Sequence, residues 1–361
     1  MGNSTIKKNV LISVPNLSKT GGVSSYWNSI LPELNNFTDI KIQRIEVGGN
    51  RKNVFGLIND QLRFKKKLNQ NIDLVVLNPS LGFRSFFRDA FLARSLVKSK
   101  ISFLVFFHGW NIDFEKSIDK NYKRFFLNSF GKANTIIVLS RDFEDKLNSW
   151  GFKGRVIVET TTLDSSLIND FSIQNKIEKI NLSNKIKILF LARLEKEKGI
   201  FETINAFKEI SSIHNNMELT IAGDGMVFNE VKKCVINENN ISIIGYVEGQ
   251  TKVDILKDNH IYCLPSYSEG LPITVLEAMA FGMPILTTKV GGLKEFIEEG
   301  KMGFFVNVKN IKDLEEKFKF FINNKNKIIE MGQYNHSYAK QNLLNIVVAK
   351  RIKKYFDKII S

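Results

Sequence analysis

Two glutamates stand in one short stretch of the chain, at a spacing that could serve a polar ligand. Residues 268–284 run Ser-Glu-Gly-Leu-Pro-Ile-Thr-Val-Leu-Glu-Ala-Met-Ala-Phe-Gly-Met-Pro, which places Glu269 before Pro272 and Glu277 after it. Thr274 lies one helical turn before Glu277 on the same face. Carboxylates accept hydrogen bonds from hydroxyl groups, and the first N–H groups of a helix attract an anion. The stretch therefore predicts a site for a ligand with an anionic middle and hydroxyl-bearing ends, as in a nucleotide diphosphate sugar.

The neighbouring sequence predicts the elements that hold these carboxylates. The apolar segments 260–264 and 285–288 are typical of buried strands. Between them we expect a loop loosened by Gly270, a helix whose first turn contains Pro272, and a helix exit at Gly282. The result is a strand, loop, helix, strand unit with both glutamates near the start of the helix.

The spacing alone leaves open a plain structural interpretation, in which Glu269 caps the helix and Glu277 is a solvated helix residue. The whole stretch, however, resembles the donor-site signature of retaining glycosyltransferases of family 4, in which seven residues separate two glutamates. The likeness is close from about residue 186 to residue 306 and faint in the first half of the chain. It implies an α/β protein of the GT-B fold, with two doubly wound Rossmann-like domains that face a cleft, and sugar transfer with retention of anomeric configuration.

The resemblance also implies roles for the catalytic candidates Glu269, His108, Lys198 and Arg193 and for the donor-binding Glu277. Glu277 would bind the ribose hydroxyls of the donor, and Glu269 the hydroxyls of its sugar. Arg193 and Lys198, in a loop after a predicted strand, would neutralise the diphosphate, although a charged loop is more often only solvated. His108 would orient the donor sugar from a strand end, where a lone histidine is otherwise a structural residue.

Further donor-binding candidates occupy predicted loops and the start of the central helix. They are Gly270, Leu271, Pro272, Ile273 and Thr274 at the helix start, Gly223 and Asp224 after a second strand, Tyr246 and Val247 after a third, and Gly21 and Gly22 in the first half. The Gly21-Gly22 pair lets backbone approach a ligand closely, or simply makes a tight connection. It is no G-x-G-x-x-G fingerprint, so it does not predict a dinucleotide site.

The rest of the chain alternates short apolar runs with amphipathic helices, which is typical of parallel sheets covered on both faces. Its 361 residues suit two domains. We predict an acceptor-binding domain over 1–170, a nucleotide-sugar donor-binding domain over 171–340, and a final helix over 341–361. By the family likeness this helix crosses back to the N-terminal domain. A polar linker is expected over 164–184.

The composition predicts a soluble, cytoplasmic protein. No apolar run reaches the roughly 18 residues of a membrane-spanning helix, and the polar N-terminus does not predict a signal peptide. Cys234 and Cys263 are the only cysteines, which argues against a disulfide framework and a cysteine metal site. No nucleic-acid-binding motif is present, so we expect no nucleic-acid partner.

The net charge of +15 is larger in the first half, where residues 1–170 carry 25 Lys and Arg against 15 Asp and Glu. The helices expected over 83–98 and 119–130 combine basic residues with phenylalanines, which suits peripheral docking on the anionic inner face of the cell membrane. The same composition also fits ordinary helices with a phenylalanine core. The residues in question are Phe83, Phe87 and Phe91 with Arg84, Arg88 and Lys98, and Phe125 and Phe126 with Lys120, Lys123 and Arg124.

Metal ligands are not evident in the sequence. It contains no Asp-x-Asp pair, and its four histidines are scattered, so we expect neither a metal nor a cofactor. The interpretation is thus a metal-independent, hexosyltransferase-type enzyme with a UDP- or GDP-sugar as donor. The acceptor would be a glycan or lipid-linked glycan in bacterial surface polysaccharide or cell-envelope assembly.

Two other functions stay open. One is a nucleotide-sugar epimerase of the same fold, for which His108 is the one obvious base. The other is a catalytically silent scaffold subunit. A silent subunit would be expected to have lost a cation or a glutamate of the donor site, and Arg193, Lys198 and both glutamates are present.

Overall fold

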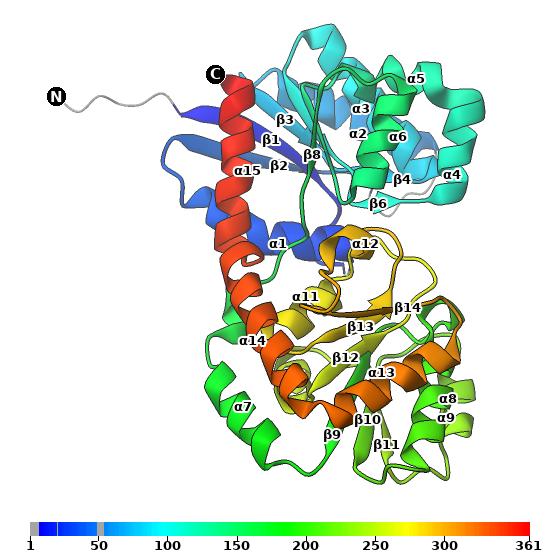
Figure 1. Ribbon diagram of the computed structural model, residues 1–361. Coiled ribbons are helices and arrows are strands. Elements are labelled where there is room, and N and C mark those ends of the chain that lie inside the picture. Colours follow the sequence, from blue (N-terminus) through cyan, green and yellow to red (C-terminus); the bar gives the residue numbers. More distant parts are fainter. Residues whose placement is uncertain (1–6, 20, 49–53) are drawn as a thin grey trace, which may run out of the picture. The chain divides into compact units, whose positions relative to one another are not determined.

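The computed structural model describes residues 7–19, 21–48 and 54–361, and these form two compact units (Figure 1). The first unit ends at Thr162 and takes in Asn345–Ser361, and the second unit is Leu163–Leu344. The chain therefore leaves the first unit somewhat before the predicted boundary at residue 170 and re-enters it shortly after residue 340.

A six-stranded parallel sheet forms the centre of the first unit, with the strand order β2-β1-β3-β5-β7-β8. Its strands are β1 (Lys8–Val14), β2 (Ile40–Glu46), β3 (Leu74–Leu77), β5 (Phe103–Phe106), β7 (Thr135–Val138) and β8 (Arg155–Val158). Every residue of β3, β5 and β7 is buried, which explains their continuously apolar sequences. The strand order reverses between β1 and β3, so a ligand crevice is expected at the carboxyl ends of these two strands.

The helices of the first unit include one region where the sequence prediction was wrong. The longer helices are α1 (Gly22–Asn35), α2 (Val54–Leu68), α3 (Phe83–Ser99) and α6 (Arg141–Trp150). Instead of one helix over 119–130, the chain forms α4 (Ile112–Ser117), the π-helical turn η1 (Ile118–Tyr122), α5 (Lys123–Leu127) and the 3-10 turn η2 (Phe130–Lys132). These short pieces bury Phe114, Ile118 and Phe126 together, which a single regular helix beginning at residue 119 does not do.

The helix α15 (Asn345–Ile360) completes the core of the first unit. Its residues Val348, Ala349, Ile352 and Phe356 are buried in one cluster with Trp27 of α1. The guanidinium of Arg351 also donates to both carboxylate oxygens of Glu159, at 3.0 Å from Nε and 2.6 Å from Nη2. The end of the chain is therefore a structural part of this unit.

The second unit has a six-stranded parallel sheet with the order β11-β10-β9-β12-β13-β14. Its strands are β9 (Ile186–Leu191), β10 (Met217–Ala222), β11 (Ile241–Gly245), β12 (Ile261–Leu264), β13 (Ile285–Thr288) and β14 (Gly303–Val306). Its helices are α7 (Ile173–Leu182), α8 (Ile200–Ser211), α9 (Phe228–Cys234), α10 (Gly249–Asp258), α11 (Ile273–Ala280), α12 (Leu293–Phe296), α13 (Ile311–Asn323) and α14 (Lys325–Asn342). The strand order reverses between β9 and β12, which predicts a ligand at their carboxyl ends.

The segment predicted as a polar linker over 164–184 is instead largely helical. It contains the 3-10 turn η3 (Ser165–Ile168) and the helix α7, whose N-terminus is capped by the Ser172 hydroxyl. Its buried face includes Ile180 and Lys176, and the Lys176 Nζ atom donates to the carbonyl oxygens of Leu256 at 2.9 Å and Phe281 at 2.7 Å. The prediction failed because a lysine occupies a core position and hides the apolar periodicity.

None of the described helices is long and apolar enough to cross a bilayer.

Candidate functional site

The carboxyl edge of the second sheet gathers the loops that follow β9, β10 and β12. The backbone N–H of Leu194 donates to the Asp224 carbonyl at 2.9 Å, and that of Tyr267 donates to the Glu197 carbonyl at 2.8 Å. These bonds join the loop after β9 to both of its neighbours. The candidates from three distant sequence segments therefore meet at the point where the strand order reverses.

Two glycines are required for this close packing of loops. Gly223 has φ 143°, and a Cβ atom there would lie 1.9 Å from the carbonyl oxygen of Ala192. Gly291 has φ 50°, and a Cβ atom would lie 1.8 Å from the carbonyl oxygen of Glu269. Any larger residue would push the neighbouring backbone away. The backbone that carries Glu269 is thus held by a glycine loop that follows β13.

Lys198 and Glu269 form an ion pair at this edge. The Lys198 ammonium lies 2.7 Å from Glu269 Oε1, and both side chains are largely buried, with 16% and 10% exposed. The Ser266 hydroxyl donates to the same oxygen at 2.8 Å. The second oxygen, Oε2, has no hydrogen-bond partner among the described residues. Glu269 does not cap α11, so the structural interpretation of this residue is wrong.

Glu277 is buried inside α11 and pairs with a residue that the sequence analysis missed. The Lys252 ammonium of α10 lies 2.7 Å from Glu277 Oε1, whereas Oε2 is buried without a partner in the described part of the chain. Burial raises the pKa of the Glu277 carboxyl, and the charge of Lys252 opposes this rise. The expectation of a solvated helix residue is therefore wrong, since only 4% of Glu277 is exposed.

Arg193 is arranged differently from Lys198. Its side chain is 73% exposed, and its guanidinium lies 2.8 Å from Glu195 Oε1. The structure thus brings Lys198 to Glu269 but leaves Arg193 paired within its own loop. An exposed ion pair of this kind contributes little stability, so Arg193 can turn to a bound anion at small cost.

The start of α11 differs in detail from the sequence prediction. Pro272 occupies the N-cap position rather than the first turn, and no side chain caps the helix. The Thr274 hydroxyl lies 2.7 Å from Tyr262 Oη, which also donates to the Leu191 carbonyl at 2.9 Å. Thr274 therefore ties α11 to β12 and β9. Leu271 is buried, and Gly270 accepts a backbone hydrogen bond from Gly292 at 2.8 Å.

The remaining candidates of the second unit line the loops after β10 and β11. The Asp224 carboxylate accepts from the Gly225 N–H at 2.7 Å. Tyr246 is 64% exposed, and its hydroxyl donates to Glu248 at 3.1 Å. Val247 is buried, so its side chain is not available to a ligand.

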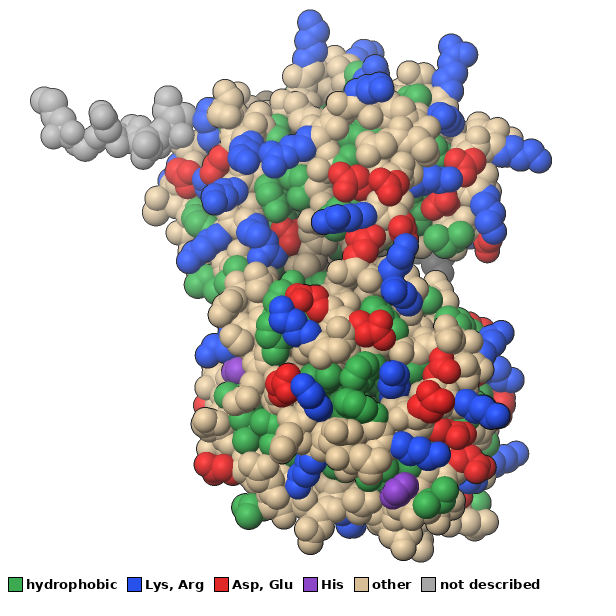
Figure 2. Space-filling model, in the orientation of Figure 1, with side chains coloured by type: hydrophobic (Ala, Val, Ile, Leu, Met, Phe, Trp, Pro, Cys, Tyr) green, Lys and Arg blue, Asp and Glu red, His purple; other side chains and the backbone are tan. Residues whose placement is uncertain are grey.

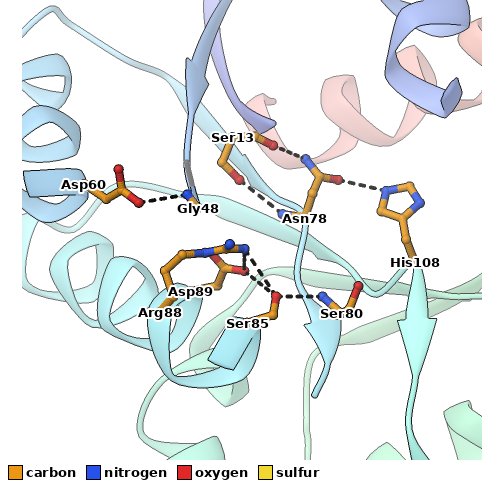
Figure 3. Close-up of polar contacts among 9 residues, drawn as sticks. All are labelled: Ser13, Gly48, Asp60, Asn78, Ser80, Ser85, Arg88, Asp89 and His108. Atoms are coloured by element: carbon orange, nitrogen blue, oxygen red, sulfur yellow. Dashed lines mark hydrogen bonds and ion pairs between the residues drawn. The ribbon is translucent and has the colours of Figure 1, made fainter. Parts of the chain in front are cut away.

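The candidates of the first unit lie at the carboxyl ends of β1 and β5. Gly21 is the N-cap residue of α1, and Gly22 is its first residue. His108 follows β5, and its Nε2 atom lies 3.0 Å from Asn78 Oδ1 (Figure 3). Asn78 follows β3, where the strand order of this sheet reverses. Burial lowers the pKa of His108 to about 3, so its ring is neutral near pH 7.

Arg88 does not belong to an exposed basic face, contrary to the sequence prediction. Its guanidinium donates from Nε to Asp89 Oδ1 at 2.9 Å and from Nη2 to Asp89 Oδ2 at 2.6 Å, and Asp89 is fully buried (Figure 3). The Ser85 hydroxyl bonds to both residues, at 3.2 Å in each case. This pair is a buried structural element of α3.

Over residues 7–19, 21–48 and 54–361, no three His, Cys, Asp or Glu side chains are grouped in a way that could hold a metal ion.

The second unit matches a known protein family. The model of glycosyl transferases group 1 matches residues 172–338, a segment that holds Lys198, Glu269 and Glu277. This segment is therefore similar to glycosyl transferases group 1. The resemblance seen in the sequence is confirmed at the level of this group.

Proteins named as glycosyltransferases match the chain over part of their length. The chain is 26% identical to the N,N'-diacetylbacillosaminyl-diphospho-undecaprenol alpha-1,3-N-acetylgalactosaminyltransferase of Campylobacter jejuni, over 67% of this chain and 68% of that protein. It is 25% identical to the putative teichuronic acid biosynthesis glycosyltransferase TuaC of Bacillus subtilis, over 54% of this chain and 49% of that one. These relatives therefore share between about half and two thirds of their length with the chain.

A solved structure of a similar protein extends the fold comparison to both units. Anabaena Alr3699/HepE, crystallised in complex with UDP, superposes with a TM-score of 0.76 at 14% identity, over 97% of this chain and all of that one. The chain therefore has the GT-B fold, which confirms the predicted fold class of two doubly wound Rossmann-like domains.

Proposed function

We propose that the protein is a retaining glycosyltransferase of family 4, which needs no metal and uses a UDP- or GDP-sugar as donor. The observation that carries the proposal is the Lys198–Glu269 pair. Lys198 follows β9 and Glu269 follows β12, and these neighbouring strands flank the point where the strand order reverses. A cation and a carboxylate are thus fixed together where an open parallel sheet binds its ligand.

The proposed roles follow from the contacts of each side chain. The Lys198 ammonium would stabilise the negative charge that develops on the diphosphate as the sugar leaves, and Arg193 would turn from Glu195 to add a second charge. Two cations so placed would do the work that a divalent metal does in other sugar transferases. Glu269 Oε2 would accept a hydrogen bond from a sugar hydroxyl, and Glu277 Oε2 from a ribose hydroxyl.

The reaction would proceed on one face of the sugar. The bond between the anomeric carbon and the phosphate oxygen breaks, and the acceptor hydroxyl oxygen forms a new bond to the same carbon. The acceptor proton passes to the leaving phosphate. The protein supplies charge stabilisation and positioning, so no protein nucleophile is needed.

The proposed acceptor is a glycan or lipid-linked glycan in the assembly of a bacterial surface polysaccharide or envelope glycan. The names of two relatives support this acceptor class. The relative from Campylobacter jejuni is named for a diphospho-undecaprenol-linked substrate, and that from Bacillus subtilis for teichuronic acid biosynthesis. A lipid-linked acceptor would also require the enzyme to work at a membrane surface.

We place this membrane contact on α2 and α3 of the first unit. A groove of about 830 Å³ between them is lined by Phe91 and by the cations Lys65, Arg94 and Lys98. The same two helices also expose large apolar side chains, namely Leu57, Ile58 and Leu62 on α2 and Phe83 and Val97 on α3. Cations together with exposed apolar side chains suit an anionic bilayer surface. The protein would then be cytoplasmic and peripheral on the inner face of the membrane.

The segment 119–130, which the sequence also suggested for membrane docking, does not support it. Phe126 is fully buried and Phe125 is half-buried against the core, although Lys120, Lys123 and Arg124 are exposed. On the face drawn in Figure 2, Lys and Arg side chains are scattered among Asp and Glu. The proposal therefore depends on the α2–α3 surface and not on net charge alone.

The epimerase alternative depends on His108 as its base. Such an enzyme must take a proton from the sugar, and a group with a pKa of about 3, as His108 has, is too weak a base near pH 7. The retained ion pairs of Lys198 and Glu277 likewise argue against a silent scaffold, which would have no need of them.

The test is a calorimetric titration of the purified protein with UDP, GDP and ADP and with their common sugar conjugates, in EDTA and in magnesium. We expect selective binding of one nucleotide that is unchanged by EDTA and is lost in Glu277→Ala but not in the exposed control Glu316→Ala. Incubation with the matching donor should then release a sugar whose first-formed anomer, observed by proton NMR, is that of the donor. Binding of none of these nucleotides, or release of the opposite anomer, would refute the proposal.

A further inference from the structure

Three residues at the carboxyl ends of neighbouring strands form a continuous hydrogen-bonded chain in the first unit (Figure 3). The Asn78 side-chain Nδ2 donates to the Ser13 carbonyl oxygen at 2.6 Å, and the Asn78 backbone N–H donates to Ser13 Oγ at 3.2 Å. On its other side Asn78 Oδ1 lies 3.0 Å from His108 Nε2. Ser13 and Asn78 are both buried.

This series of hydrogen bonds determines which nitrogen of His108 carries the proton. The Ser13 carbonyl can only accept, so the NH₂ group of Asn78 must face it. Asn78 Oδ1 therefore faces the imidazole, and it too can only accept. Nε2 must then be the protonated nitrogen, and Nδ1 carries the lone pair.

The surroundings of the ring leave Nδ1 available. His108 stacks on Phe106 with a centroid distance of 3.8 Å, and Tyr26 meets it edge-on at 4.9 Å. The Tyr26 hydroxyl has no hydrogen-bond partner in the described part of the chain, so it does not bind Nδ1. No partner of Nδ1 is found among the described residues, and His108 is partly exposed.

We propose that Asn78 is a positioning residue that holds His108 as the neutral Nε2–H tautomer and so presents Nδ1 as a hydrogen-bond acceptor for a hydroxyl group of the donor sugar. The second part of this inference rests on the proposed function. The first part does not, because the tautomer follows from contacts within the first unit. His108 is then an acceptor that orients a sugar and never a proton donor from Nδ1.

The low pKa of His108 agrees with this assignment. Burial is the cause of this shift. Of the three aromatic rings that meet His108, those of Tyr26, Trp27 and Phe106, only Tyr26 is titratable, and burial raises its pKa well above the usual value. Neither group changes charge near neutral pH. The tautomer is therefore expected to stay the same across the working range of an enzyme.

The test of the tautomer is ¹⁵N NMR of protein labelled in its four histidine rings. The His108 signals are assigned by their disappearance in His108→Gln. We expect the Nε2–H pattern, unchanged between about pH 6 and pH 8. In Asn78→Ala the ¹⁵N signals of the two ring nitrogens should move toward the values of a mixture of tautomers. In Asn78→Asp the added carboxylate should raise the pKa of His108 and produce imidazolium. A wild-type Nδ1–H pattern or imidazolium would overturn the inference, and so would a wild-type pattern retained in Asn78→Ala.

The test of the sugar contact compares two ligands. We expect Asn78→Ala to bind the donor nucleotide as the wild type does but to bind the nucleotide sugar about fivefold more weakly, because one neutral hydrogen bond is lost. An equal loss of affinity for the nucleotide and for the nucleotide sugar would show a general structural effect and contradict the sugar contact. If no nucleotide binds the wild type, the proposed function and the sugar contact fail together, while the NMR result still decides the tautomer.

Discussion

Lys252 binds one oxygen of Glu277 and leaves the other oxygen buried without a partner among the described residues. A buried carboxylate with one free oxygen is a strong acceptor for a ligand hydroxyl. Burial raises the pKa of this carboxyl and the charge of Lys252 lowers it, so the lysine favours the ionised form. The lysine on α10 is thus part of the proposed ligand site on α11.

We expect Lys252→Met to weaken nucleotide binding about tenfold near neutral pH, because loss of the lysine charge raises the pKa of Glu277 further and favours its protonated form. The sign of the pH effect separates this cause from misfolding. Raising the pH should restore ionised Glu277 and recover part of the affinity, while the variant loses stability because the raised pKa favours its protonated, folded form. Calorimetric titrations and thermal melts at three pH values check both trends. The same loss of affinity at every pH would contradict this account.

Lys198→Ala should mainly slow the chemical step. Loss of one charge that stabilises the leaving diphosphate is expected to lower kcat about 100-fold, with a much smaller change in nucleotide affinity. Steady-state kinetics with a saturating donor, beside the exposed control Lys312→Ala, measures this effect. An unchanged kcat would remove Lys198 from the catalytic site.

Gly291→Ala should destabilise the second unit and disturb the Glu269 loop. The φ of 50° disfavours any side chain, and the new Cβ atom would meet the Glu269 carbonyl oxygen at 1.8 Å. We expect a loss of about 2 kcal/mol or more in the free energy of unfolding. Urea denaturation measures this loss. Gly300→Ala is a matched control, since Gly300 also has a positive φ, of 79°, but open space around it.

Lys176→Met should remove a pH-dependent part of the stability. Burial lowers the pKa of Lys176 to about 7, and as a neutral amine it has two hydrogens for its two carbonyl partners. The unfolded chain binds this proton up to a higher pH, so the wild type should gain stability over the variant as pH rises above about 7, by at most about 1.4 kcal/mol per pH unit. Urea titrations of both proteins between about pH 7 and pH 9 give the difference. A difference that is constant with pH would mean that Lys176 keeps its charge.

Docking on a membrane should depend on the α2–α3 surface. We expect the double variant Arg94→Glu, Lys98→Glu to lose sedimentation with vesicles of phosphatidylglycerol at low salt, and Leu62→Asp to reduce it. The double variant Lys312→Glu, Lys319→Glu, at exposed positions of the second unit, serves as a control with the same change of charge. Failure of the wild type to sediment with these vesicles would refute the docking proposal without affecting the donor site.

Most of the fold was predictable because the central strands are buried on both faces and read as short apolar runs. The segment that carries Glu269 and Glu277 was predictable because both glutamates lie in one contiguous stretch of sequence. Lys252 was missed because no local pattern links positions 252 and 277, which meet only through the packing of α10 on the sheet. The helix α7 was missed because its buried face contains Lys176, whose amine satisfies backbone carbonyls rather than water.

The path of the chain also affects the order in which the protein can fold during synthesis. The second unit starts and ends side by side, since Leu163 and Leu344 form an isolated β-bridge, and it lies within the sequence of the first unit. The ribosome completes the second unit before it makes α15, which supplies part of the core of the first unit. Until the second unit has been translated, the first unit lacks α15, and an apolar face on β1 and α1 stays exposed. Chaperone binding to nascent chains should accordingly concentrate on the half that is synthesised first.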